Sequence, residues 1–166
     1  MWTIGRFLKD HTRLGEAGLF LDIGSGFGKR TSTAGQISGY ELSIGIELEA
    51  VRYRSGLGCH KKVFENERTQ PPNARRSDKV YFVHEDILEA KTFDPFTHVY
   101  SFDAIFTPDL VEGIVQRFTD SKSSYLVSSR HKNELLRLRI QAMCIESFSV
   151  ALAGSKNAKT LSVWRR

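Results

Sequence analysis

The sequence predicts an α/β fold, in which one mostly parallel sheet of seven strands ends in an antiparallel hairpin. Three observations predict it. Short apolar runs recur along the chain, and segments with helical spacing separate most of them, as in βαβ units. A glycine-rich turn follows the first of these runs. Two segments of alternating polarity near the C-terminal end are joined by a turn at residues 154–159, which indicates a hairpin.

The composition favours one globular domain that spans residues 1–166. Its 40% apolar and 26% charged residues are ordinary for a soluble protein with a buried core. No apolar run approaches the roughly 18 residues of a membrane span, and the N-terminus lacks the apolar region of a signal peptide. Cys59 and Cys144 give neither a disulfide framework nor metal-ligand spacing, so we expect an intracellular protein without a metal or membrane contact. The net charge of +5 suits an acidic partner such as nucleic acid.

The glycine-rich turn follows a strand at residues 19–21 and provides the first candidate ligand contacts. Its acid, serine and glycines are Asp22, Gly24, Ser25, Gly26 and Gly28. Glycine has no Cβ, so the backbone can turn sharply and approach a ligand closely. The spacing is GxGxG rather than the GxGxxG of dinucleotide-binding folds. A carboxylate at Asp22 would repel a pyrophosphate and attract an ammonium group. The alternative is a strand-to-helix turn that binds nothing.

This turn resembles the first motif of the class I methyltransferases, Rossmann-like enzymes that use S-adenosylmethionine (AdoMet), whose methionine part carries an ammonium group. Residues 29–38 then form a predicted helix of low intrinsic propensity. The second strand, residues 41–47, ends in Glu47 about 20 residues after the glycine turn, where a carboxylate can accept hydrogen bonds from both ribose hydroxyls. The alternative for Glu47 is a solvated acid that the dipole of the next helix favours.

Residues 60–79 are expected to form a long loop, after a helix that Gly56 and Gly58 weaken toward its end. The cations of the surrounding basic segment, residues 52–79, are Arg52, Arg54, Lys61, Lys62, Arg68, Arg75, Arg76 and Lys79. Clustered lysines and arginines neutralise phosphates. The segment is therefore either a solvated loop or a contact for nucleic acid or a nucleosome.

Asp86 and Ile87 follow the third predicted strand, residues 80–84. In class I methyltransferases an acid at this place takes the adenine amino group, and an apolar neighbour packs on the ring. Asp86 and Ile87 occupy those two places. His84, at the end of the strand and without a clear partner, is more simply a structural residue.

The remaining elements complete the sheet. Residues 97–103 are the fourth predicted strand, and Thr107-Pro108-Asp109 predicts a helix start because it combines an N-cap, a proline at the first position and an acid. An apolar stripe follows over residues 110–118. The later elements are a fifth strand at 124–129, a short helix after Arg130, and the hairpin strands around 145–152 and 161–164.

The stretch from Val99 to Arg130 resembles one family in particular, the non-SET histone H3 lysine methyltransferases of the disruptor-of-telomeric-silencing type. It contains an aromatic-rich strand, then IFTP, a helix that ends in QRF, and VSSR, and the family has a similar helix end before a small-Ser-Ser-basic run. The motifs LDIGSGFG, GIE and DIL are similar too, so the resemblance covers residues 19–130. It implies a lysine of histone H3 as the substrate, the nucleosome as the partner, and a nuclear location.

The fourth strand ends beside the first in this fold, so Tyr100, Phe102 and Asp103 are the candidate catalytic residues. Methyl transfer from a sulfonium is an in-line displacement that depends on alignment. A lysine nucleophile must lose its proton, and an aromatic channel of Tyr100, Phe102 and Phe106 would disfavour its charged form. Asp103 would orient the amine or accept its proton through water; the alternative is a turn acid. The family has paired asparagines where this chain has Phe102 and Asp103.

Two other functions stay open. One is a class I methyltransferase that acts on RNA or a small molecule, since the basic segment suits RNA as well. The other is an AdoMet-fold module that binds chromatin or a partner without catalysis. The sequence lacks the Asn/Asp-Pro-Pro-aromatic motif of adenine and glutamine amide methyltransferases, and neither cysteine lies beside the predicted site, as carbon-5 pyrimidine enzymes require.

Overall fold

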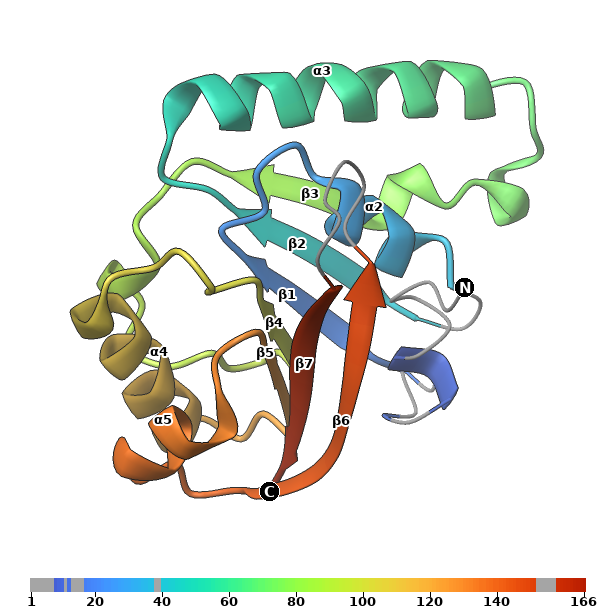
Figure 1. The fold of residues 1–166 in the computed structure, drawn as a ribbon. Helices are drawn as coiled ribbons and strands as arrows, with labels where there is room; N and C mark the ends of the chain where they lie inside the picture. The colour runs from blue at the N-terminus through green and yellow to red at the C-terminus, as the bar shows by residue number, and fades with distance from the viewer. Residues whose placement is uncertain (1–7, 11, 13–16, 38–39, 152–157) are drawn as a thin grey trace.

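The structure is a computed structural model, and it describes residues 8–10, 12, 17–37, 40–151 and 158–166. Its described strands form one seven-stranded sheet in the order β3-β2-β1-β4-β5-β7-β6 (Figure 1). The strands are β1 (Leu19–Ile23), β2 (Leu42–Ile46), β3 (Val80–Val83), β4 (His98–Ser101), β5 (Tyr125–Ser128), β6 (Met143–Ala151) and β7 (Ala158–Arg165). Strands β1 to β5 pair in parallel, while β7 runs antiparallel to both β5 and β6. The predicted fold class is confirmed.

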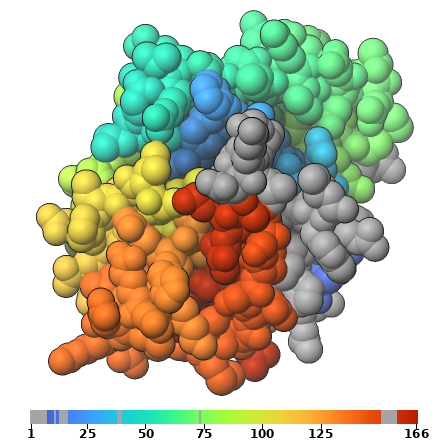
Figure 2. Space-filling view, in the orientation of Figure 1, coloured from blue at the N-terminus to red at the C-terminus, as the bar shows by residue number. Residues whose placement is uncertain are grey.

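Helices cover both faces of this sheet. They are α2 (Lys29–Gly35), α3 (Ala50–Glu67), α4 (Pro108–Asp120) and α5 (Lys132–Arg137), with short 3-10 turns η1 (Pro72–Ala74), η2 (Ser77–Lys79) and η3 (Ile87–Glu89). Helices α4 and α5 pack on one face, and α2 packs on the other. Helix α3 runs along the β3 side of the sheet and forms part of the outer surface (Figures 1 and 2). None of the helices in the described segments is long and apolar enough to cross a bilayer.

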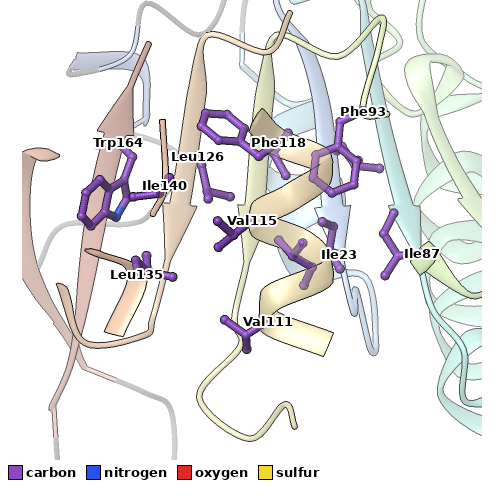
Figure 3. Packing of buried hydrophobic residues seen from close by; sticks show 13 residues of the cluster. Ile23, Ile87, Phe93, Val111, Val115, Phe118, Leu126, Leu135, Ile140 and Trp164 are labelled. Carbon is purple, nitrogen blue, oxygen red and sulfur yellow. The ribbon is translucent and has the colours of Figure 1, made fainter. Parts of the chain in front are cut away.

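The α4 face holds the larger apolar core. Most of the predicted stripe is buried, and Val111, Val115 and Phe118 of α4 point toward Ile23 and Leu126 of the sheet (Figure 3). The helix begins as its sequence predicts, with Pro108 in the first turn and the N-cap threonine hydroxyl accepting from the N–H of Leu110 at 3.4 Å. Burial of this stripe fixes α4 against the sheet and so places the loop that precedes it.

A second apolar cluster lies on the opposite face. Phe20, Tyr100 and Val127 of the parallel strands meet Leu161 of β7 and Leu8 of the N-terminal segment, and all five are almost fully buried. The alternation along β1 explains the division, because successive side chains of a strand point to opposite faces. The predicted turn at residues 154–159 lies mostly outside the described residues.

One prediction is wrong: the loop expected from residue 60 is helical as far as Glu67. Gly56 is not a helix breaker, because it is buried where α3 crosses the glycine turn, and a Cβ there would lie 3.1 Å from the Gly26 carbonyl oxygen. At the helix end the Glu67 carboxylate accepts from the N–H groups of Arg76 and Ser77 and from the Ser77 hydroxyl. Packing and this anchor therefore outweigh the low helix propensity of glycine.

Candidate functional site

A pocket of about 530 Å³ lies at the carboxyl ends of the parallel strands. Glu47, Asp86 and Ile87 all line it, together with Gly24 from the glycine turn and Phe106 from the loop after β4. The structure thus brings together the residues predicted to bind ribose and adenine, although they are far apart in the sequence. Ligand sites of parallel α/β sheets lie at this edge.

Glu47 follows β2 and connects two segments of the site. Its side chain is 6% exposed. Its Oε2 accepts from the N–H of Gly26 at 2.8 Å, and its Oε1 accepts from the N–H of Glu49 at 2.9 Å. A carboxylate oxygen has a second lone pair, so both oxygens can still accept from a ligand hydroxyl. Glu47 is therefore both a ribose candidate and the link between the glycine turn and the start of α3.

Asp86 and Ile87 form the far wall of this pocket. Asp86 caps the turn η3, because its Oδ1 accepts from the N–H of Leu88 at 2.9 Å. That contact holds the carboxyl group in place and leaves Oδ2 for an amino group of a ligand. Ile87 is 7% exposed and presents an apolar surface beside it. The pair has the chemistry that an adenine ring requires.

The glycine turn closes the pocket at Gly24. The N–H groups of Gly24 and Ser25 both donate to the carbonyl oxygen of Ile46, at 2.9 and 3.0 Å, which ties the turn to β2. Gly24 has a φ of +66°, a left-handed conformation that favours glycine, and the Phe106 ring lies directly over it. A Cβ at Gly24 would lie 2.6 Å from Cζ of Phe106. Both the conformation and the space therefore favour glycine.

A second pocket, of about 220 Å³, shares Gly24 with the first. Its charged residues are Asp22, Lys29 and Arg30. Asp22 is 2% exposed, and its Oδ2 accepts from the N–H and the hydroxyl of Thr31, at 3.0 and 2.7 Å. Burial raises the pKa of Asp22 to about 6, although these bonds and the nearby Arg30 act in the opposite direction.

Lys29 and Arg30 line the second pocket and were not among the residues predicted from the sequence. The available signal was their position in the first turn of the helix that follows the last glycine. Ser25 and the exposed Phe27 complete the glycine-turn side of this pocket.

Two of the three candidate catalytic residues line the second pocket. Tyr100 is 1% exposed, and burial raises the pKa of its hydroxyl. Phe102 is half-buried, just beyond the end of β4. Phe106 lines the first pocket instead. The three residues of the predicted aromatic channel are therefore divided between two pockets that share Gly24.

Asp103 lies outside the lining of both pockets. Its Oδ1 accepts from the N–H and the hydroxyl of Ser129, each at 2.8 Å, and its Oδ2 accepts from the hydroxyl of Ser128 at 2.6 Å. Burial raises its pKa, and these hydrogen bonds partly offset the rise. Arg130 adds to the connection by donating to the carbonyl oxygen of Phe106. Asp103 therefore joins the end of β4 to the end of β5, which holds the loop that carries Phe106.

The basic segment 52–79 is divided by the structure. Arg75 donates to the carbonyl oxygens of Gln70 and Arg68, and Lys79 donates to that of Tyr40, so these cations stabilise their own neighbourhood. The cations that α3 presents to solvent are Arg52, Arg54, Lys61 and Lys62, with Arg68 at its C-terminal cap. Within the described residues there is no group of three or more His, Cys, Asp or Glu side chains arranged to hold a metal.

No protein family model and no curated protein matches the sequence. Solved structures do match the fold. An RNA methyltransferase from Salinibacter ruber, in complex with S-adenosyl-L-homocysteine, matches with a TM-score of 0.64 and 18% identity, over 98% of this chain and 89% of that one. Magnesium protoporphyrin IX methyltransferase from Synechocystis PCC 6803, with bound AdoMet, matches with a TM-score of 0.73 and 10% identity, over 98% and 76%.

A third match is geranyl diphosphate C-methyltransferase from Streptomyces coelicolor A3(2), whose crystals also contain S-adenosyl-L-homocysteine. It aligns with a TM-score of 0.68 and 14% identity, over 98% of this chain and 79% of that one. At these identities the likeness concerns the fold. The chain has the Rossmann-like fold of the class I methyltransferases, as its sequence predicts.

Proposed function

We propose that this chain is an AdoMet-dependent methyltransferase. The observation that carries the proposal is a pair of pockets that share Gly24, one lined by Glu47 and Asp86 and the other by Asp22 and two cations. Together they match a ligand with a nucleoside at one end and an amino acid at the other. The similar folds crystallised with AdoMet or S-adenosyl-L-homocysteine support the same cofactor.

The first pocket fits the adenosine part. Glu47 would accept hydrogen bonds from the ribose hydroxyls while it keeps its two backbone donors. Oδ2 of Asp86 would accept from the adenine amino group, and Ile87 would pack on the ring. A volume of about 530 Å³ is within the usual range for small-molecule sites.

The second pocket fits the zwitterionic end of methionine. Both hydrogen bonds from Thr31 reach Oδ2 of Asp22, so Oδ1 is the oxygen we assign to the ammonium group. Lys29 and Arg30 line the same cavity and would pair with the carboxylate. Opposite charges within one small, partly closed cavity attract each other more strongly than they would in water.

The chemistry that AdoMet supplies is a methyl group on a positively charged sulfur, open to attack by a nucleophile. Gly24 lies where the two pockets meet, and its lack of a side chain leaves room there. A Cβ at this position would strike the Phe106 ring. Tyr100, Phe102 and Phe106 provide apolar walls around this junction and would keep water from the reacting atoms. Alignment of the acceptor, rather than a strong base, is what this arrangement provides.

The acceptor that the comparisons support is RNA or a small molecule. Similar folds include RNA, porphyrin and terpene methyltransferases. A lysine of histone H3 is the second candidate, and it rests on the sequence resemblance of the stretch from Val99 to Arg130 alone. A nucleosome partner and a nuclear location belong to that candidate, and a non-catalytic module remains the third.

Transfer of a radiolabelled methyl group from AdoMet separates these candidates. Total RNA, nucleosomes and a small-molecule extract would be offered in turn, with the Glu47→Ala variant as the inactive control. We expect label in the RNA or the small-molecule fraction. Label confined to nucleosomes would support the histone candidate, and AdoMet binding without any labelled product would contradict an enzyme and support the module.

A further inference from the structure

Helix α3 presents one row of cations to solvent. Arg54, Lys61 and Arg68 recur every seven residues, which places them on one side of the helix about 10 Å apart. Leu57 and Phe64 lie between them in the sequence, and their side chains are 38% and 39% exposed. This side of the helix therefore alternates positive charge with accessible apolar surface.

A groove lies beside this row. It has a volume of about 490 Å³ and runs between α3, which contributes Leu57, His60 and Phe64, and the edge strand β3, which contributes Tyr81 and Phe82. Tyr81 is 53% exposed. The His60 ring lies against the Phe82 ring, with 5.5 Å between their centroids, and this contact fixes the inner wall. We call this feature, together with the row of cations, the α3 groove.

The chain around the α3 groove is positively charged overall, because residues 50–80 contain eight lysines and arginines but three acids. Lys61 and Glu65 lie 3.8 Å apart, but both are exposed, and such a pair contributes little. Glu67 is used internally, because its carboxylate accepts from the backbone of Arg76 and Ser77. Asp78 is the acid that lines the groove itself. The α3 groove thus suits an anionic partner that also offers flat apolar surfaces.

We propose that the α3 groove binds single-stranded RNA. Lysines and arginines in a row track a phosphate backbone, and unstacked bases stack on exposed aromatic rings such as Phe64 and Tyr81. A duplex keeps its base faces stacked inside and would leave those rings unused. The inference rests on the proposed methyltransferase function, for which it makes RNA the acceptor class.

The position of α3 connects this groove to the cofactor site. Helix α3 begins at Ala50, which lines the adenosine pocket, and its Gly56 lies against the glycine turn. Arg54 is therefore the cation of the row nearest the site, and Arg68 lies about 20 Å farther along. An RNA strand held along this row runs toward the edge of the sheet where methyl transfer would occur.

Two triple variants test the groove. The first is Arg54→Ala with Lys61→Ala and Arg68→Ala. The matched control replaces three exposed lysines outside α3 by alanine, and these are Lys91, Lys122 and Lys132. Each triple variant lowers the net charge from +5 to +2, so both remove the same charge but from different places. Fluorescence anisotropy measures their affinity for a labelled RNA of about 10 nucleotides, a common site size for one domain.

The proposal predicts at least a tenfold loss of affinity for the first triple variant and less than a twofold loss for the control. It also predicts that the slope of log affinity against log salt falls by about 2 in the first variant alone. Phe64→Ala should weaken binding by about 5- to 150-fold, the range for loss of one stacked base, while Phe64→Tyr should preserve it. A thermal melt confirms that each variant is folded.

Equal losses in the two triple variants would overturn the proposal, because only net charge would then matter. Binding of duplex DNA or single-stranded DNA as tightly as RNA would also overturn it. AdoMet calorimetry on the native chain separates failure of the RNA-binding proposal from failure of the methyltransferase proposal. Intact AdoMet binding with no RNA binding refutes the α3 groove alone, whereas RNA binding without AdoMet binding refutes the methyltransferase proposal.

Discussion

Asp22→Asn should stabilise the protein at neutral pH and weaken AdoMet binding. Asp22 is buried, and its pKa is raised from 3.8 to about 6, so the folded chain holds an ionised carboxyl group at pH 7 in an environment that disfavours it. A shift of this size corresponds to about 3 kcal/mol. An amide oxygen in place of Oδ2 would keep both hydrogen bonds from Thr31, so the substitution removes the charge and little else.

The sign of the pH dependence follows from linkage. A carboxyl group whose pKa is raised on folding favours the folded state at low pH, and that contribution is lost as the pH rises through about 6. The stability difference between Asp22→Asn and the native chain should therefore be about 3 kcal/mol at pH 7 and shrink to about 1 kcal/mol at pH 4.5.

Urea denaturation across this pH range measures that difference, and calorimetry measures AdoMet binding in the same samples. We expect the variant to be more stable and to bind AdoMet at least tenfold more weakly at pH 7. If the variant were less stable than the native chain at pH 7, or if the difference did not change with pH, the assignment of Asp22 as a buried ionised group would be refuted. Unchanged AdoMet affinity would refute its role toward the ammonium group.

Two further predictions concern the glycine turn and Asp103. Gly26→Ala should cost about 1–2 kcal/mol, because Gly26 is left-handed but has open space around it, whereas Gly24→Ala should cost about 1–3 kcal/mol more because its Cβ strikes Phe106. Equal losses in urea denaturation would show that Phe106 does not occupy that space. Asp103→Ala should cost about 1–3 kcal/mol, since the Ser129 N–H loses its acceptor, while Asp103→Asn should keep the fold and retain kcat within about tenfold. A hundredfold loss of kcat in a stably folded Asp103→Asn variant would instead support the catalytic role predicted from the sequence.

The sheet and the pocket that we assign to adenosine were predictable from local patterns. Apolar runs and turn residues indicate the strands, and the acids Glu47 and Asp86 each follow one of these strands. A parallel sheet brings the carboxyl ends of its strands to one edge, so these two acids lie close together. The start of α4 was predictable from its N-cap threonine and the following proline, because helix capping depends on adjacent residues.

Other features depend on contacts that the sequence does not display. Gly56 indicated the end of a helix, but in the structure it permits a close approach to the glycine turn. Asp103 was expected near the methyl group because it follows β4 closely. The structure instead turns its carboxyl group toward Ser128 and Ser129, at the end of a strand more than twenty positions away. Such side-chain directions are decided by tertiary partners rather than by spacing.

Calorimetric titration of the native chain with AdoMet is the most direct test of the proposed cofactor site. We expect one site with micromolar affinity. Glu47→Ala should weaken AdoMet binding by about 1–3 kcal/mol, because the ribose loses its contacts with the Glu47 carboxylate. Glu112→Ala, on the exposed side of α4, should leave AdoMet binding unchanged. Absence of binding by the folded native chain, or binding that Glu47→Ala does not affect, would contradict the assignment of these two pockets to AdoMet.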